Sequence, residues 1–434
     1  MKKRYVMYLL IILAMVLAAC QPAATPAPAA EQPAAEEEAA PATEEAAAPT
    51  AEEEAAPAAG APEECAADPL GCAVVEPGQT VKIGMGAPMT GDYSMFGIDI
   101  SQAVSFALKQ SGGIEGWEFE LVAEDTQGSP EAGAAVASRF VTDPTMIAIA
   151  GHIFSGSSEA AMPIYEKAGF PMLSPSATNP PLTQQGSKVF NRTAFTDATQ
   201  AQFAAKLMYE DLGYTKIAAM HDGTSYGQGL AEEVRKNFEA MGGEVVAFEA
   251  ITPGEVDYIA PLSAVAALSP EAIYYGGYAA EAIVMANQWQ QAGLEGVTLF
   301  GCDGTYGVEF TDKTGPNGEG SIAVSLVPPA SPEKEAFDAA YKAEYGLEAG
   351  ELSAFTWSSF DVGNVLVDAA RKVVIKGADG NLYFPRTQMV EAVRGTKGFQ
   401  GLTGLISCDE IGECNASGPN FYIVENGAWV PFSK

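Results

Sequence analysis

Short apolar runs alternate with longer amphipathic stretches from about residue 80 onward. Runs rich in Val, Ile, Met and Ala, such as MIAIA at 146–150, have the length and composition of buried strands. In the longer stretches, apolar residues recur every three or four positions, which is the spacing of a helix with one buried face. Strands that alternate with helices predict a parallel sheet covered by helices on both faces.

The alternation occurs in two sets that are separated near residues 189–195, and each set is long enough for a domain. We therefore expect an α/β protein with two doubly wound parallel-sheet lobes joined by a hinge. After residue 327 the chain turns to long helices and then to short strands, with a hairpin at Asn426-Gly427. This order predicts that lobe I comprises 78–197 and 327–411, and lobe II 198–326 and 412–434. The predicted helices are 97–111, 130–143, 155–169, 198–212, 229–241, 260–268, 280–292, 332–345, 353–373 and 386–394.

The N-terminus has the pattern of an export signal. A basic start, Lys2-Lys3-Arg4, precedes an apolar run over 5–19 that is shorter than the roughly 20 residues of a membrane-spanning helix. The run ends in Leu-Ala-Ala-Cys, which resembles a bacterial lipobox. We therefore expect residues 1–19 to be a signal peptide and Cys20 to be lipidated in the cell membrane. A plain signal peptide that is cut elsewhere is the alternative.

Composition then indicates a tether. Residues 21–64 contain eleven Glu and neither Lys nor Arg among many Ala and Pro, so they lack the side chains of a core. We expect 20–77 to be the lipidated cysteine followed by a disordered linker. The formal net charge of −33 argues against nucleic acid as a partner, because phosphate binding needs patches of Lys and Arg.

Cysteine and histidine positions bear on oxidation and metals. In an exported chain, Cys65 could pair with Cys72 and Cys408 with Cys414 as local disulfides, which leaves Cys302 as a buried thiol. His152 and His221 each follow a strand without further Cys or His nearby, so we expect no metal site.

The segment from Gly151 to Thr178 is the most informative for function. Its two consecutive strand ends offer hydroxyls, Ser155 and Thr178, beside the start of a helix, and this arrangement favours an anion such as a carboxylate. The alternative is that both residues only cap helices.

An enzyme is the competing class. Residues 223–227, Gly-Thr-Ser-Tyr-Gly, fit a nucleophile elbow between a strand and a helix, with Ser225 as nucleophile. That fold places its histidine after the nucleophile, and the last histidine here is His221. IGMGAPMTG also lacks the Lys-Ser/Thr of a phosphate-binding loop. We therefore expect neither catalysis nor a cofactor.

Residues 80–434 resemble the bacterial solute-binding proteins for leucine, isoleucine and valine, which are type I periplasmic binding proteins that feed ABC importers. The motifs that carry the resemblance are IGMGAPMTGDYSMFG, GHIFSGSSEAAMPIYEKAG, MLSPSATNPPLT, HDGTSYGQGLAEEV, YYGGYAAEA and GLTGLIS. It implies a lipid-anchored, extracytoplasmic, monomeric protein that binds a free amino acid between closing lobes. Its partner would be a membrane permease.

The resemblance also implies roles for individual residues. Ser155 and Thr178 would bind the ligand's α-carboxylate, and the Ser176 carbonyl and Asp303 its α-ammonium. Tyr226 and Tyr278 would close over the ligand from lobe II. The side-chain pocket would be lined by Phe96, Ile153, Phe154, Ala177 and Phe355.

Two departures from the family pattern concern specificity. Phe154 replaces a smaller residue, and Asp303 replaces a glutamate. A small aliphatic side chain or a different amino acid therefore remains open, as do the short amides, urea and aromatic acids that the same fold binds. Asp303 as a solvated loop acid or helix cap, the two tyrosines and Phe355 as core residues, and ligand sensing instead of transport are the remaining alternatives.

Overall fold

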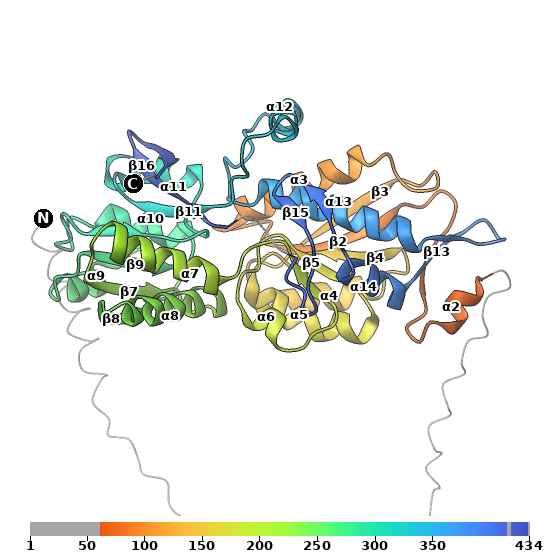
Figure 1. The fold of residues 1–434 in the computed structure, drawn as a ribbon, viewed down its shortest axis with the longest axis horizontal. Helices are drawn as coiled ribbons and strands as arrows, with labels where there is room; N and C mark the ends of the chain where they lie inside the picture. Colours follow the sequence, from red (N-terminus) through yellow and green to blue (C-terminus); the bar gives the residue numbers. More distant parts are fainter. Residues whose placement is uncertain (1–60, 415–417, 433–434) are drawn as a thin grey trace, which may run out of the picture. The chain divides into compact units, whose positions relative to one another are not determined.

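The computed structural model describes residues 61–414 and 418–432. Their strands form two larger sheets, one in each expected lobe, and two smaller ones (Figure 1). The predictions for the signal peptide, for Cys20 and for the tether up to residue 60 fall outside the described residues.

Lobe I is built on a five-stranded parallel sheet. Across the sheet, the strands are β3 (Phe119–Asp125), β2 (Val81–Ala87), β4 (Met146–Ala150), β5 (Met172–Ser174) and β6 (Phe190–Arg192). The helices are α3 (Ser94–Gln110), α4 (Pro130–Phe140), α5 (Ser155–Ala168), α6 (Pro181–Gln184), α12 (Pro332–Tyr345), α13 (Thr356–Val373) and α14 (Arg386–Arg394). Apolar residues of α3 and α13 pack on one face of the sheet and those of α4 and α5 on the other (Figure 1). Both faces are thus covered, and every residue of β4 is buried.

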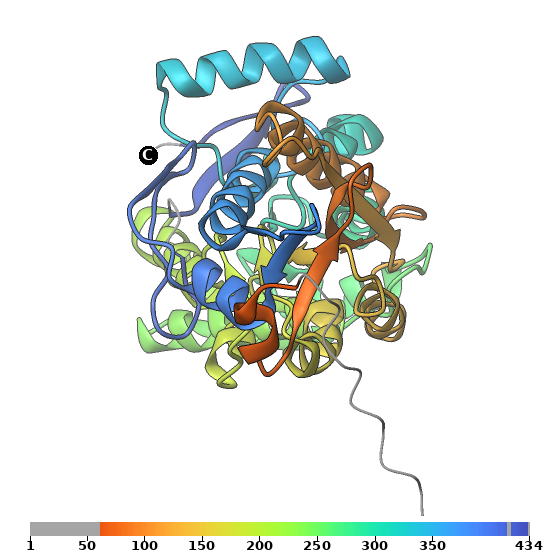
Figure 2. The same ribbon diagram turned by 90° about the vertical axis from the view of Figure 1, so that its right-hand side faces the viewer.

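Helix α12 is attached to lobe I through aromatic rings. Phe337 and Tyr341 of α12 contact the ring of Phe106 on α3, with ring centroids 6.0 and 6.2 Å apart. Figure 2 shows α12 lying across the outer side of this lobe.

Lobe II is built on a seven-stranded sheet. Across the sheet, the strands are β17 (Ala428–Pro431), β16 (Asn420–Glu425), β11 (Ile322–Ser325), β10 (Thr298–Phe300), β9 (Ala272–Gly276), β7 (Lys216–His221) and β8 (Glu244–Ala250). The five from β11 to β8 are parallel, and the hairpin β16–β17 is antiparallel. Its turn is at Asn426-Gly427, as predicted, and both residues have positive φ.

Helices also cover both faces of this second sheet. They are α7 (Asp197–Lys206), α8 (Ser225–Ala240), α9 (Ile259–Ala266), α10 (Ala279–Gln288) and α11 (Val308–Thr314). Side chains alternate along β9, so Tyr274 packs with residues of α7 and α8 while Tyr275 packs with residues of α9 and α10. The two-lobe α/β architecture is the one predicted.

The fold begins earlier than predicted. Helix α2 (Glu63–Ala67) and strand β1 (Cys72–Val75) lie in the part of 20–77 that the sequence analysis placed in the tether. β1 pairs with β13 (Leu382–Pro385), which pairs in turn with β12 (Ile375–Lys376). The pairing partner is about 310 residues away in sequence, so local composition could not indicate it.

The lobe boundary at 411/412 is also wrong. The Arg192 amide donates to the Gly412 carbonyl and the Cys414 amide to the Arg192 carbonyl, both at 2.9 Å, so residues 412–414 lie beside β6 of lobe I. The chain enters lobe II only after Cys414. Within the described residues it passes between lobes after β6, after β11 and after Cys414.

Both predicted disulfides are present, Cys65–Cys72 and Cys408–Cys414, and Cys302 is a free, fully buried thiol. A two-stranded sheet, β14 (Phe399–Gly401) with β15 (Gly404–Ile406), precedes the second disulfide. The first helix turns were predicted less well: α8 begins at Ser225 because Thr224 caps it by accepting from the Gly227 amide. Likewise α3 begins at Ser94 and α13 at Thr356, rather than at 97 and 353.

Candidate functional site

Ends of neighbouring strands form the lobe I side of the site. The Ser176 hydroxyl, after β5, donates to the Ile153 carbonyl after β4 at 2.7 Å, and the Asn179 amide donates to the Ser155 hydroxyl at 3.3 Å. These bonds hold the two strand-end loops together. Ser155 is the first residue of α5, and its side chain is buried. The helix N-terminus, with its unpaired amides and positive dipole end, faces this loop.

A buried arginine holds the second loop in place. Arg192 is completely buried, and its guanidinium donates to the carbonyls of Ala177 at 3.1 Å and Asn179 at 2.7 Å. It also forms an ion pair with Glu413 at 2.6 Å. The loop between Ala177 and Asn179 therefore has a fixed backbone, because two of its carbonyls bind one rigid fork of donors. Sequence reasoning missed Arg192, since its partner lies 221 residues away.

Lobe II contributes a network centred on Asp303. Tyr226 donates its hydroxyl proton to Asp303 Oδ1 at 2.5 Å, and Gln200 donates its side-chain amide to the same oxygen at 2.7 Å. The Asp303 amide returns a bond to Gln200 Oε1 at 3.0 Å. Burial raises the pKa of Asp303 above its usual range, and the hydrogen bonds from Tyr226 and Gln200 act in the opposite direction.

A second buried carboxyl, Asp197, lies beside the first. Its side chain is fully buried at the start of α7, and neither carboxylate oxygen has a hydrogen-bond partner within the described residues. Burial raises the pKa of Asp197 well above its usual value, and the nearby Asp303 adds to the shift. The Thr178 hydroxyl lies near this carboxyl and is likewise unpartnered in the described part of the chain. Together they leave a buried polar region without a counter-charge.

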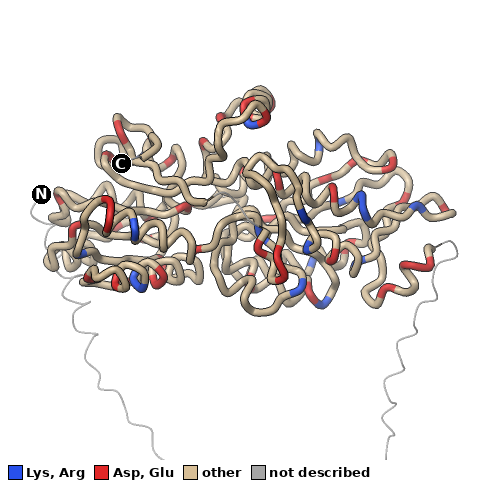
Figure 3. Tube along the Cα trace, viewed as in Figure 1, with Lys and Arg blue, Asp and Glu red and all other residues tan. Residues whose placement is uncertain are grey.

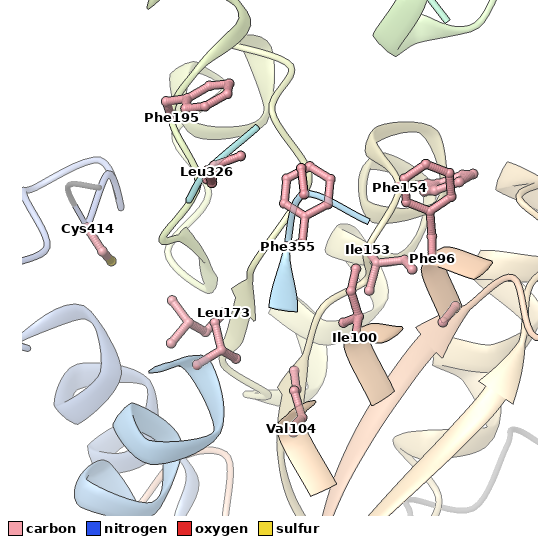
Figure 4. Packing of buried hydrophobic residues seen from close by; sticks show 14 of the residues in the cluster. Phe96, Ile100, Val104, Ile153, Phe154, Leu173, Phe195, Leu326, Phe355 and Cys414 are labelled. Carbon is pink, nitrogen blue, oxygen red and sulfur yellow. The ribbon is translucent and has the colours of Figure 1, made fainter. Parts of the chain in front are cut away.

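Aromatic rings from both lobes surround these polar groups. Phe154 of lobe I stacks on Tyr278 of lobe II, with ring centroids 4.4 Å apart and an interplanar angle of 14°. Phe96 meets both rings edge-on, at 5.6 and 5.7 Å. Figure 4 shows the Phe96 and Phe154 side chains close together, with Ile153 and Phe355 nearby.

These residues enclose a cavity of about 270 Å³ between the lobes. It is lined by Phe96, Ile153, Phe154, Ser155, Ser176, Tyr226, Tyr278, Asp303, Gly304 and Phe355. The structure thus brings nine of the eleven predicted residues together. The other two lie outside the lining: Ala177 packs in the core of lobe I, and Thr178 lies beside Asp197.

Three contributors were not predicted. A side chain at Gly304 would meet the Gly277 carbonyl at 2.6 Å, so glycine lets the chain pass close to Tyr226 and Tyr278. Asp197 and Gln200 occupy the first turn of a helix, where acidic and polar residues are common for local reasons. Nothing in the local pattern separates a buried pair there from a solvated one.

Ser225 belongs to a helix start and not to a catalytic elbow. Thr224 caps α8, and the Asn179 side-chain amide donates to the Ser225 carbonyl, which links the two lobes. His221 Nδ1 accepts from the Gly223 amide at 3.1 Å. In the described ranges, no three His, Cys, Asp or Glu side chains gather as a metal site. A search of the same ranges found no helix with the length and hydropathy of a membrane span.

Residues 80–422 match the family model described as periplasmic binding protein. The chain belongs to this family. Among curated relatives, the leucine-, isoleucine-, valine-, threonine- and alanine-binding protein of Pseudomonas aeruginosa is 31% identical over 340 residues, which cover 77% of this chain and 87% of the relative. The Leu/Ile/Val-binding protein homolog 1 of Brucella suis is 30% identical over 352 residues, covering 80% and 91%.

Solved structures agree on the fold. The leucine binding protein LivK from Thermotoga maritima gives a TM-score of 0.74 at 31% identity, covering 82% of this chain and 98% of that one. The branched-chain amino acid transporter substrate binding protein LivJ from Streptococcus pneumoniae, in complex with isoleucine, gives 0.72 at 27% identity, covering 81% and 98%. The predicted family and its type I fold are therefore confirmed. These relatives are solute-binding proteins and not enzymes.

Proposed function

We propose that this chain is the extracytoplasmic, lipid-anchored solute-binding protein of an ABC importer, and that it binds a free neutral amino acid between its lobes. The observation that carries this proposal is the polarity of the cavity. Hydroxyls and a helix N-terminus face it from lobe I, and a buried carboxyl, Asp303, faces it from lobe II. A zwitterionic ligand would satisfy both sides.

The carboxylate end of the ligand would bind at Ser155 and Thr178. The Ser155 hydroxyl can donate a proton to an anion while α5 presents its positive dipole end. Charge-assisted hydrogen bonds of this kind contribute roughly 1.5–3 kcal/mol each, which offsets the cost of removing the carboxylate from water.

The ammonium end would bind at Asp303, with the Ser176 carbonyl as a further acceptor. Arg192 is the cation nearest in the argument, but its guanidinium already binds Glu413. An ammonium group would supply the missing positive charge and would lower the pKa of Asp303 toward its usual range. Binding would then release a proton from the buried pair that Asp303 forms with Asp197.

The remaining parts of the proposal rest on the family and on the N-terminus. Relatives are named for branched-chain and other neutral amino acids. A permease partner follows from the transporter named for one of these structures. The lipid anchor at Cys20 and a monomeric state rest on the sequence. Acidic residues are spread along both lobes (Figure 3), which agrees with a small ligand rather than a nucleic acid.

A thermal-shift screen of the full chain against the twenty amino acids, urea, short amides and benzoates tests the proposal. A ligand at 100 times its Kd adds about 2.7 kcal/mol to the free energy of unfolding. We expect shifts with neutral amino acids. Shifts only with amides, urea or aromatic acids would keep the fold and remove the roles given to Asp303 and Ser155.

Replacing Asp303 tests the ammonium site directly. Asp303→Asn keeps an acceptor for Tyr226 but removes the charge, so we expect the Kd of the amino acid to rise by roughly 100-fold or more, since losing one partner of a buried ion pair costs about 3 kcal/mol. The matched control is Asp368→Asn, which removes the surface ion pair with Lys372. Equal affinities of the two variants in titration calorimetry would exclude Asp303 from binding the ligand.

A further inference from the structure

A second cavity lies on the other side of the aromatic rings that close the ligand cavity. It encloses about 990 Å³ against about 270 Å³ for the inner one. The three residues that line both cavities are Phe154, Tyr226 and Tyr278. These rings are therefore a wall between two spaces. The other residues of the outer cavity are Tyr93, Gly128, Pro130, Gly156, Glu159, Ala160, Gly223, Thr224 and Ser225.

Two of the three rings in the wall are fixed differently from the third. Tyr226 is held by its hydroxyl, which donates to Asp303 and accepts from the Gly304 amide at 3.1 Å. Tyr278 stands against Tyr226, with ring centroids 5.2 Å apart. Phe154 has no polar group, and only ring contacts hold it against Tyr278, including the edge contact with Tyr93 at 5.8 Å. Phe154 is thus the part of the wall that can be changed without disturbing the polar network.

Small residues keep the outer cavity open. A side chain at Gly128 would approach the Phe154 ring to 3.3 Å, and one at Gly156 would approach Pro130 to 3.3 Å. Gly128 also has a φ of +74°, which side chains rarely adopt. Space for a larger ligand group therefore exists next to the site, and the Phe154 ring separates the site from it.

We propose that Phe154 determines specificity by limiting the ligand to a short side chain, of the size of alanine, threonine or valine. This inference rests on the proposed binding of an amino acid and narrows it. An amino acid held at Asp303 and Ser155 has its side chain among Phe96, Ile153 and Phe154, all of which line the inner cavity. A longer or aromatic side chain meets the Phe154–Tyr278 stack and cannot pass it.

Titration calorimetry with alanine, valine, leucine and phenylalanine tests the inference on the full chain. For the unchanged protein we expect affinity to fall from alanine or valine to phenylalanine. Phe154→Ala joins the two cavities, so the ratio of the phenylalanine Kd to the alanine Kd should fall at least tenfold, since misfit of one methylene already changes binding by roughly 10–200-fold. Phe154→Leu should give an intermediate ratio and serves if the alanine variant does not fold.

Glu159→Ala is the matched control, because Glu159 lines only the outer cavity and leaves the wall intact. Its ratio should equal that of the unchanged protein. The inference is overturned if the unchanged protein binds leucine and phenylalanine as tightly as alanine, or if the folded Phe154 variants keep its ratio. Binding of none of the four amino acids would instead refute the proposed function, and this inference with it.

Discussion

Removing one hydroxyl that joins the lobes should weaken ligand binding without touching the ligand. Tyr93 precedes α3 in lobe I, and its hydroxyl donates to Glu281 Oε1 of α10 in lobe II at 3.0 Å. Burial, together with Glu281, raises the pKa of Tyr93, so the hydroxyl keeps its proton at every physiological pH. This bond can exist only while the lobes are in contact.

The expected magnitude follows from the surroundings of Glu281. Its side chain is buried, and burial raises its pKa while the bond from Tyr93 lowers it. In Tyr93→Phe, Glu281 Oε1 keeps only the Gly254 amide at 3.2 Å. A hydrogen bond to a charged group contributes roughly 1.5–3 kcal/mol, and separated lobes lack this bond. The loss therefore falls on closure, and the Kd should rise by roughly 10- to 100-fold.

Titration calorimetry on Tyr93→Phe, with the amino acid that gives the largest thermal shift, measures this effect. The control is Tyr258→Phe, because the Tyr258 hydroxyl donates to the Thr252 carbonyl at 2.8 Å within lobe II. That variant should lower the melting temperature but leave the Kd unchanged. A Kd for Tyr93→Phe within twofold of the unchanged protein would refute the role of this bond in closure.

Two further predictions concern pH and anchoring. Asp99 is fully buried, which raises its pKa to about 6 although hydroxyls of Ser353, Thr356 and Tyr341 donate to it. Because the folded state holds the proton more tightly, its contribution to the free energy of unfolding is present below about pH 4 and lost as pH rises to about 6, at most about 3 kcal/mol. Asp99→Asn should therefore flatten this slope in thermal unfolding between pH 4 and 7, and an unchanged slope would contradict the assignment. Cys20→Ala should release the protein from membranes in fractionation while ligand affinity stays the same; membrane retention would disprove the lipid anchor.

The sequence predicted the parts of the site that follow from strand order. Ser155 and Ser176 each follow a buried parallel strand, and Asp303 follows another, so the rule that ligands bind at the carboxyl ends of such strands placed them together. The resemblance to a family added Tyr226 and Tyr278. Both local disulfides were also foreseeable, since cysteines six or seven residues apart must lie close in space.

The buried charges around this site could not be foreseen. Arg192 with Glu413, and Asp197 beside Asp303, are pairs of residues more than 100 positions apart, and each looks like an ordinary surface residue in its local sequence. Burial and pKa depend on what packs against a side chain, and for these groups that is decided by distant segments.

By itself, the sequence determined the alternation of strands and helices, and hence two doubly wound lobes with polar strand ends between them. Only the tertiary structure decided that β1 completes a sheet with β13, and that Phe154 stacks on Tyr278 to divide two cavities. The physical reason is the range of the interactions. Hydrophobic periodicity acts along one element and is written in its residues, whereas cross-lobe stacking and long-range strand pairing arise only when the chain has brought remote surfaces together.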